Sequence, residues 1–330
     1  MVLRRAVLAV ALLFSRSLVA QVSTAAGGPY APLILLLPSG PRTLAVGNTG
    51  VAGRDDDVLF FNPAQLVIAR GFSGSIERYS ATSAGGALSA VTRFNTGGIA
   101  IGMRMVDYET PAAAYPLDRG SMLNAAFGNG TSLEASVGVG QLIKGYRVGL
   151  AGKYVEDNAP ALRVSRGALD LGVSKDFFGP YTFALAVQNI GASTDVSCAR
   201  TGTCTPPPSG MDPFPTTKVR LPLRATLGVQ TQRPVGQLDL MGTAAVYMLR
   251  PNWTGADGAN WLGASGGAEL GYSWLDGYSV ALRAGARSTL PGEAAFTAGA
   301  GFTMDRLSID YAAEALIGSR WGQRIGLRVR

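Results

Sequence analysis

From residue 71 to the end of the chain, apolar residues alternate with polar or small ones along successive short segments. In the stretch SLEASVGVGQLI, for example, Leu133, Val137 and Val139 share one face, and Glu134 and Ser136 share the other. A period of two is typical of β-strands whose two faces meet different surroundings. One face stays apolar throughout, whereas the other carries Arg, Asp, Glu, Gln, Ser and Gly. The pattern therefore predicts antiparallel strands in series.

About fourteen such segments can be delimited, an even number, as single-chain bacterial outer-membrane barrels have. Their predicted bounds are Gly71–Ser80, Ser83–Phe94, Gly97–Glu109, Thr131–Ile143, Tyr146–Asp157, Arg163–Phe177, Tyr181–Gly191, Leu221–Arg233, Gly236–Arg250, Trp261–Leu275, Gly277–Leu290, Glu293–Met304, Arg306–Leu316 and Arg320–Arg330. Gly, Pro, Asn and Asp lie where the chain must reverse. Two connections are long, Thr110–Gly120 and Ala192–Arg220, and Ser121–Asn129 fits either a strand extension or a loop.

Strands of this kind suit either a soluble barrel or sandwich with an apolar core, or a membrane barrel with an apolar exterior. The segments have about the length of a tilted membrane strand, and no long helical pattern interrupts them. An all-β fold follows, a transmembrane antiparallel β-barrel of about 14 strands with a short N-terminal plug of small helices. We expect it in the bacterial outer membrane, with outer-membrane lipid around it.

The N-terminus supports export. Arg4 and Arg5 precede an apolar run, and Ala20 is a small residue suited to a cleavage site, so residues 1–20 read as a signal peptide. A membrane anchor is the alternative, but the run is much shorter than the roughly 20 residues of a spanning helix. The predicted organisation is therefore 1–20 signal peptide, 21–70 N-terminal plug segment and 71–330 barrel.

Composition narrows the possible functions. The chain contains 44 Gly and no His, and only 15% of its residues are charged. Without His it lacks the commonest general base and metal ligand, so we expect no enzyme, no cofactor and no metal. The net charge of +7 falls to +4 if Arg4, Arg5 and Arg16 leave with the signal peptide, and no aromatic and basic motif indicates nucleic acid.

The two cysteines, Cys198 and Cys204, stand close together in the longer of the two connections. In an exported chain such a pair suggests a disulfide, and two ligands are too few for a zinc site. The connection is rich in proline, so we place it outside the barrel. It is either a solvated insertion stiffened by the crosslink or a binding loop.

The stretch GRDDDVLFFNPAQL, before the first strand, concentrates the chemically distinctive residues. Asp55, Asp56 and Asp57 could cap a short helix, and Asn62 before Pro63 is a second helix start. Phe60 and Phe61 would then anchor the plug on apolar lumen surface. A calcium or magnesium site is an alternative, although consecutive carboxylates point in different directions. The favoured interpretation is that the acids pair with arginines of the lumen and fix the plug.

The same region resembles the N-terminal signature of outer-membrane barrels related to the fatty acid transporter FadL, and most closely the PorV/PorQ branch associated with type IX secretion. The matching positions are Gly40, Arg42, Gly47, Gly50, Ala52, Asp56, Asp57, Phe60, Phe61, Asn62, Pro63, Ala64 and Leu66. The resemblance implies a fourteen-stranded barrel occluded by its N-terminal segment. The sequence departs from the signature at Pro41, Asn48 and Gln65, and it ends in Arg330 where an aromatic residue is usual.

The polar face of the strands supplies arginines that could meet the acidic run. These lumen-facing basic residues are Arg104, Arg147, Arg224, Arg283, Arg287, Arg324 and Arg328. They could equally be balanced by wall carboxylates, namely Glu134, Asp170, Asp310 and Glu314, in a hydrated interior.

Two functions remain open. The first is a barrel that passes hydrophobic small molecules and is gated by its N-terminal plug. The second is a PorV/PorQ-like partner in protein secretion, which would bind exported or secretion-system proteins and conduct nothing. A purely structural barrel would do neither.

Overall fold

The computed structural model describes residues 32–79, 83–110, 128–158, 162–177, 179–192, 194–195, 197–198, 218–219, 221–250, 261–288, 296–316 and 320–330. The predicted signal peptide therefore lies outside the described residues. Within the described residues, no helix is long and apolar enough to cross a membrane.

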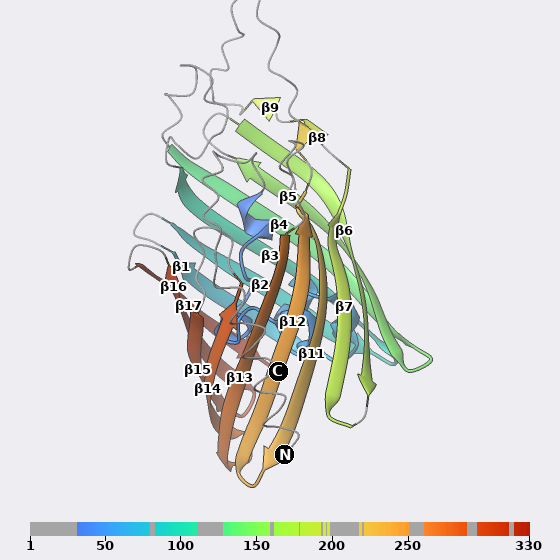
Figure 1. Cartoon of the computed structure of the whole chain (residues 1–330), viewed down its shortest axis with the longest axis vertical. Helices are drawn as coiled ribbons and strands as arrows, with labels where there is room; N and C mark the ends of the chain where they lie inside the picture. Colours follow the sequence, from blue (N-terminus) through green and yellow to red (C-terminus); the bar gives the residue numbers. More distant parts are fainter. Residues whose placement is uncertain are drawn as a thin grey trace, which may run out of the picture.

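Fourteen long strands in the described part of the chain close into one antiparallel barrel (Figure 1). They are β1 (Gly71–Arg78), β2 (Ala84–Phe94), β3 (Gly97–Thr110), β4 (Gly128–Ile143), β5 (Tyr146–Asn158), β6 (Leu162–Phe177), β7 (Tyr181–Ile190), β11 (Leu223–Val235), β12 (Leu238–Arg250), β13 (Trp261–Leu275), β14 (Tyr278–Arg287), β15 (Phe296–Met304), β16 (Leu307–Leu316) and β17 (Arg320–Val329). Consecutive long strands pair throughout, β7 pairs with β11, and β1 pairs with β17 from Phe72 opposite Val329 to Arg78 opposite Gln323. The predicted barrel is confirmed.

Three strands of two residues each lie in the connection between β7 and β11. They are β8 (Thr194–Asp195), β9 (Ser197–Cys198) and β10 (Lys218–Val219). β8 pairs with β10, and β9 pairs antiparallel with the first two residues of β6. Cys204 lies outside the described residues and so does the side chain of Cys198, so the predicted disulfide stays a prediction.

The two faces of the strands meet opposite surroundings. Ile76, Val137 and Leu282 point outward and are 76%, 53% and 64% exposed, whereas the inward Glu134 and Asp170 are fully buried. A soluble barrel would show the reverse, with apolar residues inside. Outward apolar side chains around a closed barrel are the arrangement that a lipid bilayer requires.

The two ends of the barrel differ. Tight turns join β2 to β3, β4 to β5, β11 to β12, β13 to β14 and β15 to β16, all at one end of the barrel (Figure 1). The strand ends that the longest connections join lie at the other end. At the β4–β5 turn Lys144 and Gly145 have φ of 50° and 80°, as a type I′ hairpin needs. Outside the barrel near these turns, Trp274 stacks on Tyr272 and Phe302 with ring centroids 6.4 and 6.1 Å apart. Aromatic residues commonly mark the membrane interface in such barrels.

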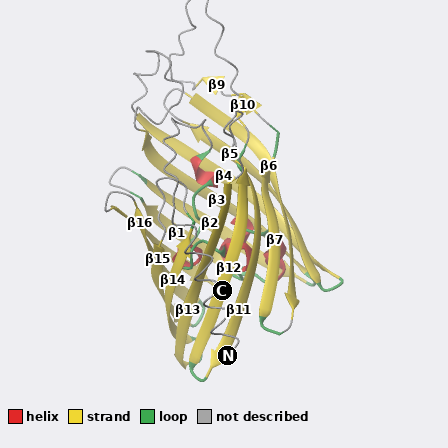
Figure 2. Cartoon of the chain, viewed as in Figure 1, coloured by secondary structure: helices red, strands yellow, loops and turns green. Residues whose placement is uncertain are grey.

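The N-terminal segment folds inside the barrel as short helices (Figure 2, red). These are η1 (Leu33–Leu35), α2 (Pro41–Ala45), η2 (Gly50–Ala52), η3 (Asp56–Phe60) and η4 (Pro63–Val67), of which only α2 is an α-helix. We call residues 32–70 the plug.

Candidate functional site: the plugged lumen

The plug winds around the inner wall of the barrel. η1 packs on β3 and β4, α2 on β14 to β17, η2 on β7 and β11, and η3 and η4 on β1 to β6. Val46 also lies directly on Gly267 of β13, and Gly47 lies against Gly266 of β13 and Gly285 of β14. The plug therefore contacts nearly the full circumference of the lumen.

Glycines on the inward face of the strands allow the plug to approach the barrel wall closely. A Cβ added at Gly149 would overlap Pro63, one at Gly172 would overlap Asn62, and one at Gly98 would overlap Leu66. The backbone of η4 therefore lies against bare backbone of three strands. This close approach accounts for part of the unusual glycine content of the chain.

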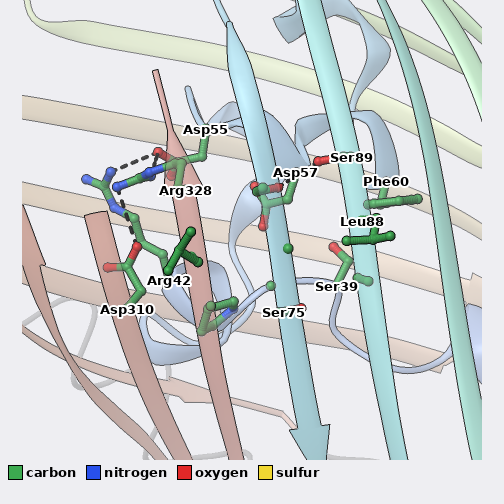
Figure 3. Close-up of a pocket in the computed structure, with 17 residues that line it drawn as sticks. Ser39, Arg42, Asp55, Asp57, Phe60, Ser75, Leu88, Ser89, Asp310 and Arg328 are labelled. Carbon is green, nitrogen blue, oxygen red and sulfur yellow. Dashed lines mark hydrogen bonds and ion pairs between the residues drawn. The ribbon is translucent and has the colours of Figure 1, made fainter. Parts of the chain in front are cut away.

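Asp55 is the centre of an ion-pair network between the plug and the wall. Its carboxylate pairs with Arg42 of the plug at 2.8 Å, with Arg328 of β17, and with Arg330 at 2.9 Å. Arg42 in turn lies 2.8 Å from Glu269 of β13. Figure 3 shows Arg42 and Arg328 directed at the carboxylate of Asp55. We call Asp55 with its three arginines the Asp55 latch.

The charges of the latch reinforce one another. Burial alone would raise the pKa of Asp55, but Arg42, Arg328 and Arg330 outweigh it and hold that pKa well below its usual value. Burial alone would lower the pKa of Arg42, whereas Asp55 and Glu269 raise it above its usual value. Asp55 and Arg42 are therefore both ionised near neutral pH.

Asp55 does not act as a helix cap, contrary to the prediction for the run of three aspartates. Asp55 occupies the N-cap position of η3 but makes no capping hydrogen bond there, because its carboxylate is bound by the three guanidinium groups. Asp57 accepts a hydrogen bond of 3.0 Å from the hydroxyl of Thr43. The side chain of Asp56 lies outside the described part of the structure.

Asn62 and Pro63 begin η4. Asn62 is fully buried, accepts from the backbone N–H of Ala64 at 3.0 Å and donates to the carbonyl of Val51 at 2.8 Å. One side chain thus caps η4 and ties it to η2. Pro63 fills the first helical position, where its missing N–H costs nothing.

The two phenylalanines of the motif pack in different directions. Phe60 lies against Gly102 of β3, and the guanidinium group of Arg104 stands 4.9 Å from its ring centroid. Phe61 packs against Gly50 of the plug and borders a small cavity that it shares with wall residues such as Gln188. Phe60 therefore makes the direct contact with the wall.

The seven arginines assigned to the lumen all lie inside the barrel, and Arg104, Arg324 and Arg328 bind the plug directly. Arg328 binds Asp55, Arg104 donates to the carbonyl of Leu37 at 3.1 Å, and Arg324 donates to the carbonyl of Pro38 at 2.8 Å. The others make wall contacts: Arg147 with Asp176, Arg283 with Asp310, Arg287 with Glu314, and Arg224 over the ring of Tyr247.

A second charged cluster lies on β3 to β6. Glu134 pairs with Arg104 and lies 3.6 Å from Lys153, and Lys153 lies 2.7 Å from Asp170. Lys153 and Glu269 were not singled out from the sequence, although both stand on the polar face of an alternating strand. Gln188, which donates to the carbonyl of Phe60 at 2.8 Å, was also missed for want of a charge.

Toward the end with the long connections the lumen becomes apolar. Val106, Val155, Ala168 and Leu221 form a buried cluster there, with Tyr79 and Tyr108 packed against it. Ile34 and Leu35 of the plug pack into this cluster and are 4% and 8% exposed. We call it the apolar chamber.

A small cavity of about 30 Å³ separates the plug from β1, β2 and β17 (Figure 3). The hydroxyls of Ser39 and Ser75 border it and have no hydrogen-bond partner among the described residues. Its size and these two unpaired hydroxyls suit an ordered water.

Closed strands, an apolar exterior and a charged, plugged interior define a transmembrane β-barrel of the outer-membrane type. No family model and no curated protein matches the chain in sequence.

Solved structures place the fold among barrels of the FadL type. A FadL homologue of Pseudomonas aeruginosa superposes with a TM-score of 0.53 at 11% identity, over 88% of this chain and 97% of that one. The toluene transporter TodX of Pseudomonas putida gives 0.53 at 10% identity, over 93% and 98%. The monoaromatic hydrocarbon channel CymD gives 0.50 at 10% identity, over 89% and 97%. The expected likeness to FadL-related barrels is thus confirmed for the fold, and the PorV/PorQ branch stays a prediction.

Proposed function

We propose that the protein passes hydrophobic small molecules across the outer membrane, and that displacement of the plug opens the path. Short turns face the periplasm in barrels of this type and long loops face outward. The apolar chamber then lies at the outer end of the lumen, and the Asp55 latch lies nearer the periplasm.

The observation that carries this proposal is the apolar chamber itself. Wall residues that face the interior of a membrane barrel are normally polar. Here Val106, Val155 and Ala168 face inward, and apolar residues of the plug cover them. A hydrophobic molecule that takes the place of Ile34 and Leu35 would meet the same surface.

The way the plug is held is compatible with a gate. The plug makes apolar contacts in the chamber, around η3 and η4, from η2 to Ala184 and Ala245, and from α2 to Ala312. Its other contacts are ion pairs and hydrogen bonds that water can replace. The main ones are the Asp55 latch and the bonds from Arg104 and Arg324 to the plug carbonyls. Release of the plug would expose charged and glycine-lined wall without unfolding the barrel.

The structural neighbours support the same class of cargo. TodX is described as a toluene transporter and CymD as a monoaromatic hydrocarbon channel. At 10% identity they support transport of hydrophobic molecules only in general terms, and the cargo of this chain is left open.

The proposal is tested by uptake of a hydrophobic fluorescent probe, N-phenyl-1-naphthylamine, into proteoliposomes. Ile34→Asp with Leu35→Asp places charge in the apolar chamber, so η1 should leave it and uptake should rise severalfold. Leu36→Asp is the matched control, because Leu36 is half-buried and outside the chamber cluster. Deletion of residues 21–70 should raise uptake further. Uptake that stays at the wild-type level in both folded variants would rule out gating by the plug.

A role in protein secretion is the second candidate. It depends on the sequence resemblance and on the long connection that holds the cysteines, most of which lies outside the described residues. Recovery of secretion components with the barrel from outer membranes, together with unchanged uptake in the plug variants, would favour it over transport.

A further inference from the structure

A larger cavity of about 290 Å³ lies between the plug and the wall strands β11 and β12. It is at the end with the short turns, since Gln232 and Met241 of its lining stand close to the β11–β12 turn. Its apolar lining is limited to a few side chains, among them Val46, Ile68 and Met241. This inner cavity is thus on the opposite side of the plug from the apolar chamber.

The charged groups of the inner cavity are mostly positive. Arg42, Arg54, Arg70 and Arg330 line it, and Asp55 is the one carboxylate among its described lining residues. The charge of Asp55 is already shared among the three arginines of the latch. The cavity therefore has an excess of positive charge.

Two of these arginines, Arg54 and Arg70, form only a weak ion pair or none with the described residues. Arg54 lies 3.9 Å from Asp176, and both side chains are about half exposed, so the ion pair contributes little stability. Arg54 also donates one hydrogen bond of 3.2 Å to the hydroxyl of Thr182, which leaves its other N–H groups available. Arg70 is exposed and makes no ion pair with any described residue. Both guanidinium groups can therefore bind an additional partner.

Gln230 supplies a neutral donor at the same place. It stands on the inward face of β11, lines the cavity and is only 8% exposed. Among the described residues no hydrogen bond of its side-chain amide is seen, and the amide is not one of the fully enclosed unpaired groups, so it is open to the cavity. This amide, beside the guanidinium groups of Arg54 and Arg70, is suited to a polar ligand.

We propose that the inner cavity binds a small oxyanion, a carboxylate or a phosphate. Arg54 and Arg70 would provide charge-assisted hydrogen bonds, for which the planar guanidinium group is the best donor in proteins. The amide N–H of Gln230 would provide a neutral hydrogen bond from the wall. The site is separate from the apolar chamber, so it does not depend on the proposed transport of hydrophobic molecules.

Isothermal titration of the detergent-solubilised full barrel tests the proposal with two probes, inorganic phosphate and succinate, at constant ionic strength set with sodium chloride. We expect saturable binding of at least one probe, and the probe that binds identifies the source of the oxyanion. Gln230→Glu keeps the shape of the side chain and adds a negative charge, so it should weaken binding at least tenfold. Gln237→Glu, in the nearby β11–β12 turn, should change it less than twofold.

A second pair of variants separates the site from general surface charge. Arg70→Ala should weaken binding at least fivefold, whereas Arg306→Ala, an exposed arginine in the β15–β16 turn, should leave it unchanged. The heat-dependent shift in gel mobility shows whether each variant barrel is folded, and Gln230→Ala replaces Gln230→Glu if the latter is not. Absence of saturation for both probes, or equal loss in the control variants, would overturn the proposal.

Discussion

Asp55 joins the plug to the last strand of the barrel. Its carboxylate forms ion pairs with Arg42 on the plug and with Arg328 and Arg330 after the last turns of the chain. Removing one member of a buried ion-pair network costs more than the pair contributes, because the remaining charges stay buried without a partner. The effect of changing this one residue should therefore be large.

We predict that Asp55→Asn loosens the plug by roughly 3 kcal/mol, the lower end of the range for breaking a buried ion pair. The barrel should still insert, because its strand pairing does not involve Asp55. Limited proteolysis within residues 32–70 of the reconstituted protein measures plug release. Asp305→Asn is the control, since Asp305 is an exposed turn residue with φ of 50°, which Asn also tolerates. Equal proteolysis of the two variants would contradict the role of Asp55.

The latch should be insensitive to pH over the physiological range. The pKa of Asp55 in the folded protein is below its unfolded value of about 3.9. Its contribution is therefore fully present above about pH 4 and is lost only as the pH falls toward the lower, folded pKa. Proteolysis of the plug should be constant from pH 8 to about pH 5. A transition near pH 6 that persists in Asp55→Asn would assign the control of the plug to another group.

At the scale of single residues, the alternation of the strands was enough to place side chains in the lumen. Arg104 and Arg328 were found in this way, and the same rule would have found Glu269 and Lys153. It could not find their partners, because a partner depends on strand register and on the path of the plug. The capping role expected of Asp55 failed for the same reason, since the competing arginines are distant in sequence.

At the scale of elements, the fit between η4 and the wall depends on missing side chains. Pro63, Asn62 and Leu66 lie where Cβ atoms at Gly149, Gly172 and Gly98 would be. The plug thus recognises the wall partly through backbone contact, which any larger residue would prevent.

We predict that Gly149→Ala displaces η4 and destabilises plug docking by about 1–3 kcal/mol, the usual cost of an added methyl group in a packed site. Gly152→Ala is a close control on the same strand, because a Cβ there would meet only Leu169, at 4.0 Å. Plug proteolysis and probe uptake should rise in the first variant and stay at the wild-type level in the second. Equal behaviour of both would show that the plug is not seated on Gly149.

The strands were predictable as elements because each carries its own period-2 pattern. Trp261–Leu275 has the predicted bounds, and β1 and β14 end two to three residues early. The plug helices were predictable only as short helix starts. Four of the five are 3₁₀ turns of three to five residues, too short for any periodic signal, and their arrangement is set by the wall around them.

At the scale of the whole molecule, the apolar exterior requires a membrane. Outward residues such as Ile101 and Leu282 are 62% and 64% exposed, and the charges are gathered inside. The depth of each outward residue in the bilayer should then decide the effect of a charge placed there.

We predict that Ile101→Arg, in the middle of the outward face of β3, destabilises the barrel in lipid vesicles by about 2–4 kcal/mol. Ile143→Arg, beside the β4–β5 turn, should cost about 0–1 kcal/mol, because an arginine near the interface reaches water. Both residues are more than half exposed, so loss of protein contacts is comparable. Urea unfolding in vesicles measures the difference, and equal costs would contradict the assigned depth.

The closure between β1 and β17 joins the strand that follows the plug to the last strand of the barrel. The plug runs directly into β1 at its C-terminal end, and Arg324, Arg328 and Arg330 hold it from the β17 side. The plug therefore bridges the β1–β17 closure from inside the barrel. The contacts of the plug with Arg324, Arg328 and Arg330 can form only when β17 lies beside β1, so a fully docked plug is a record that the ring of strands has closed.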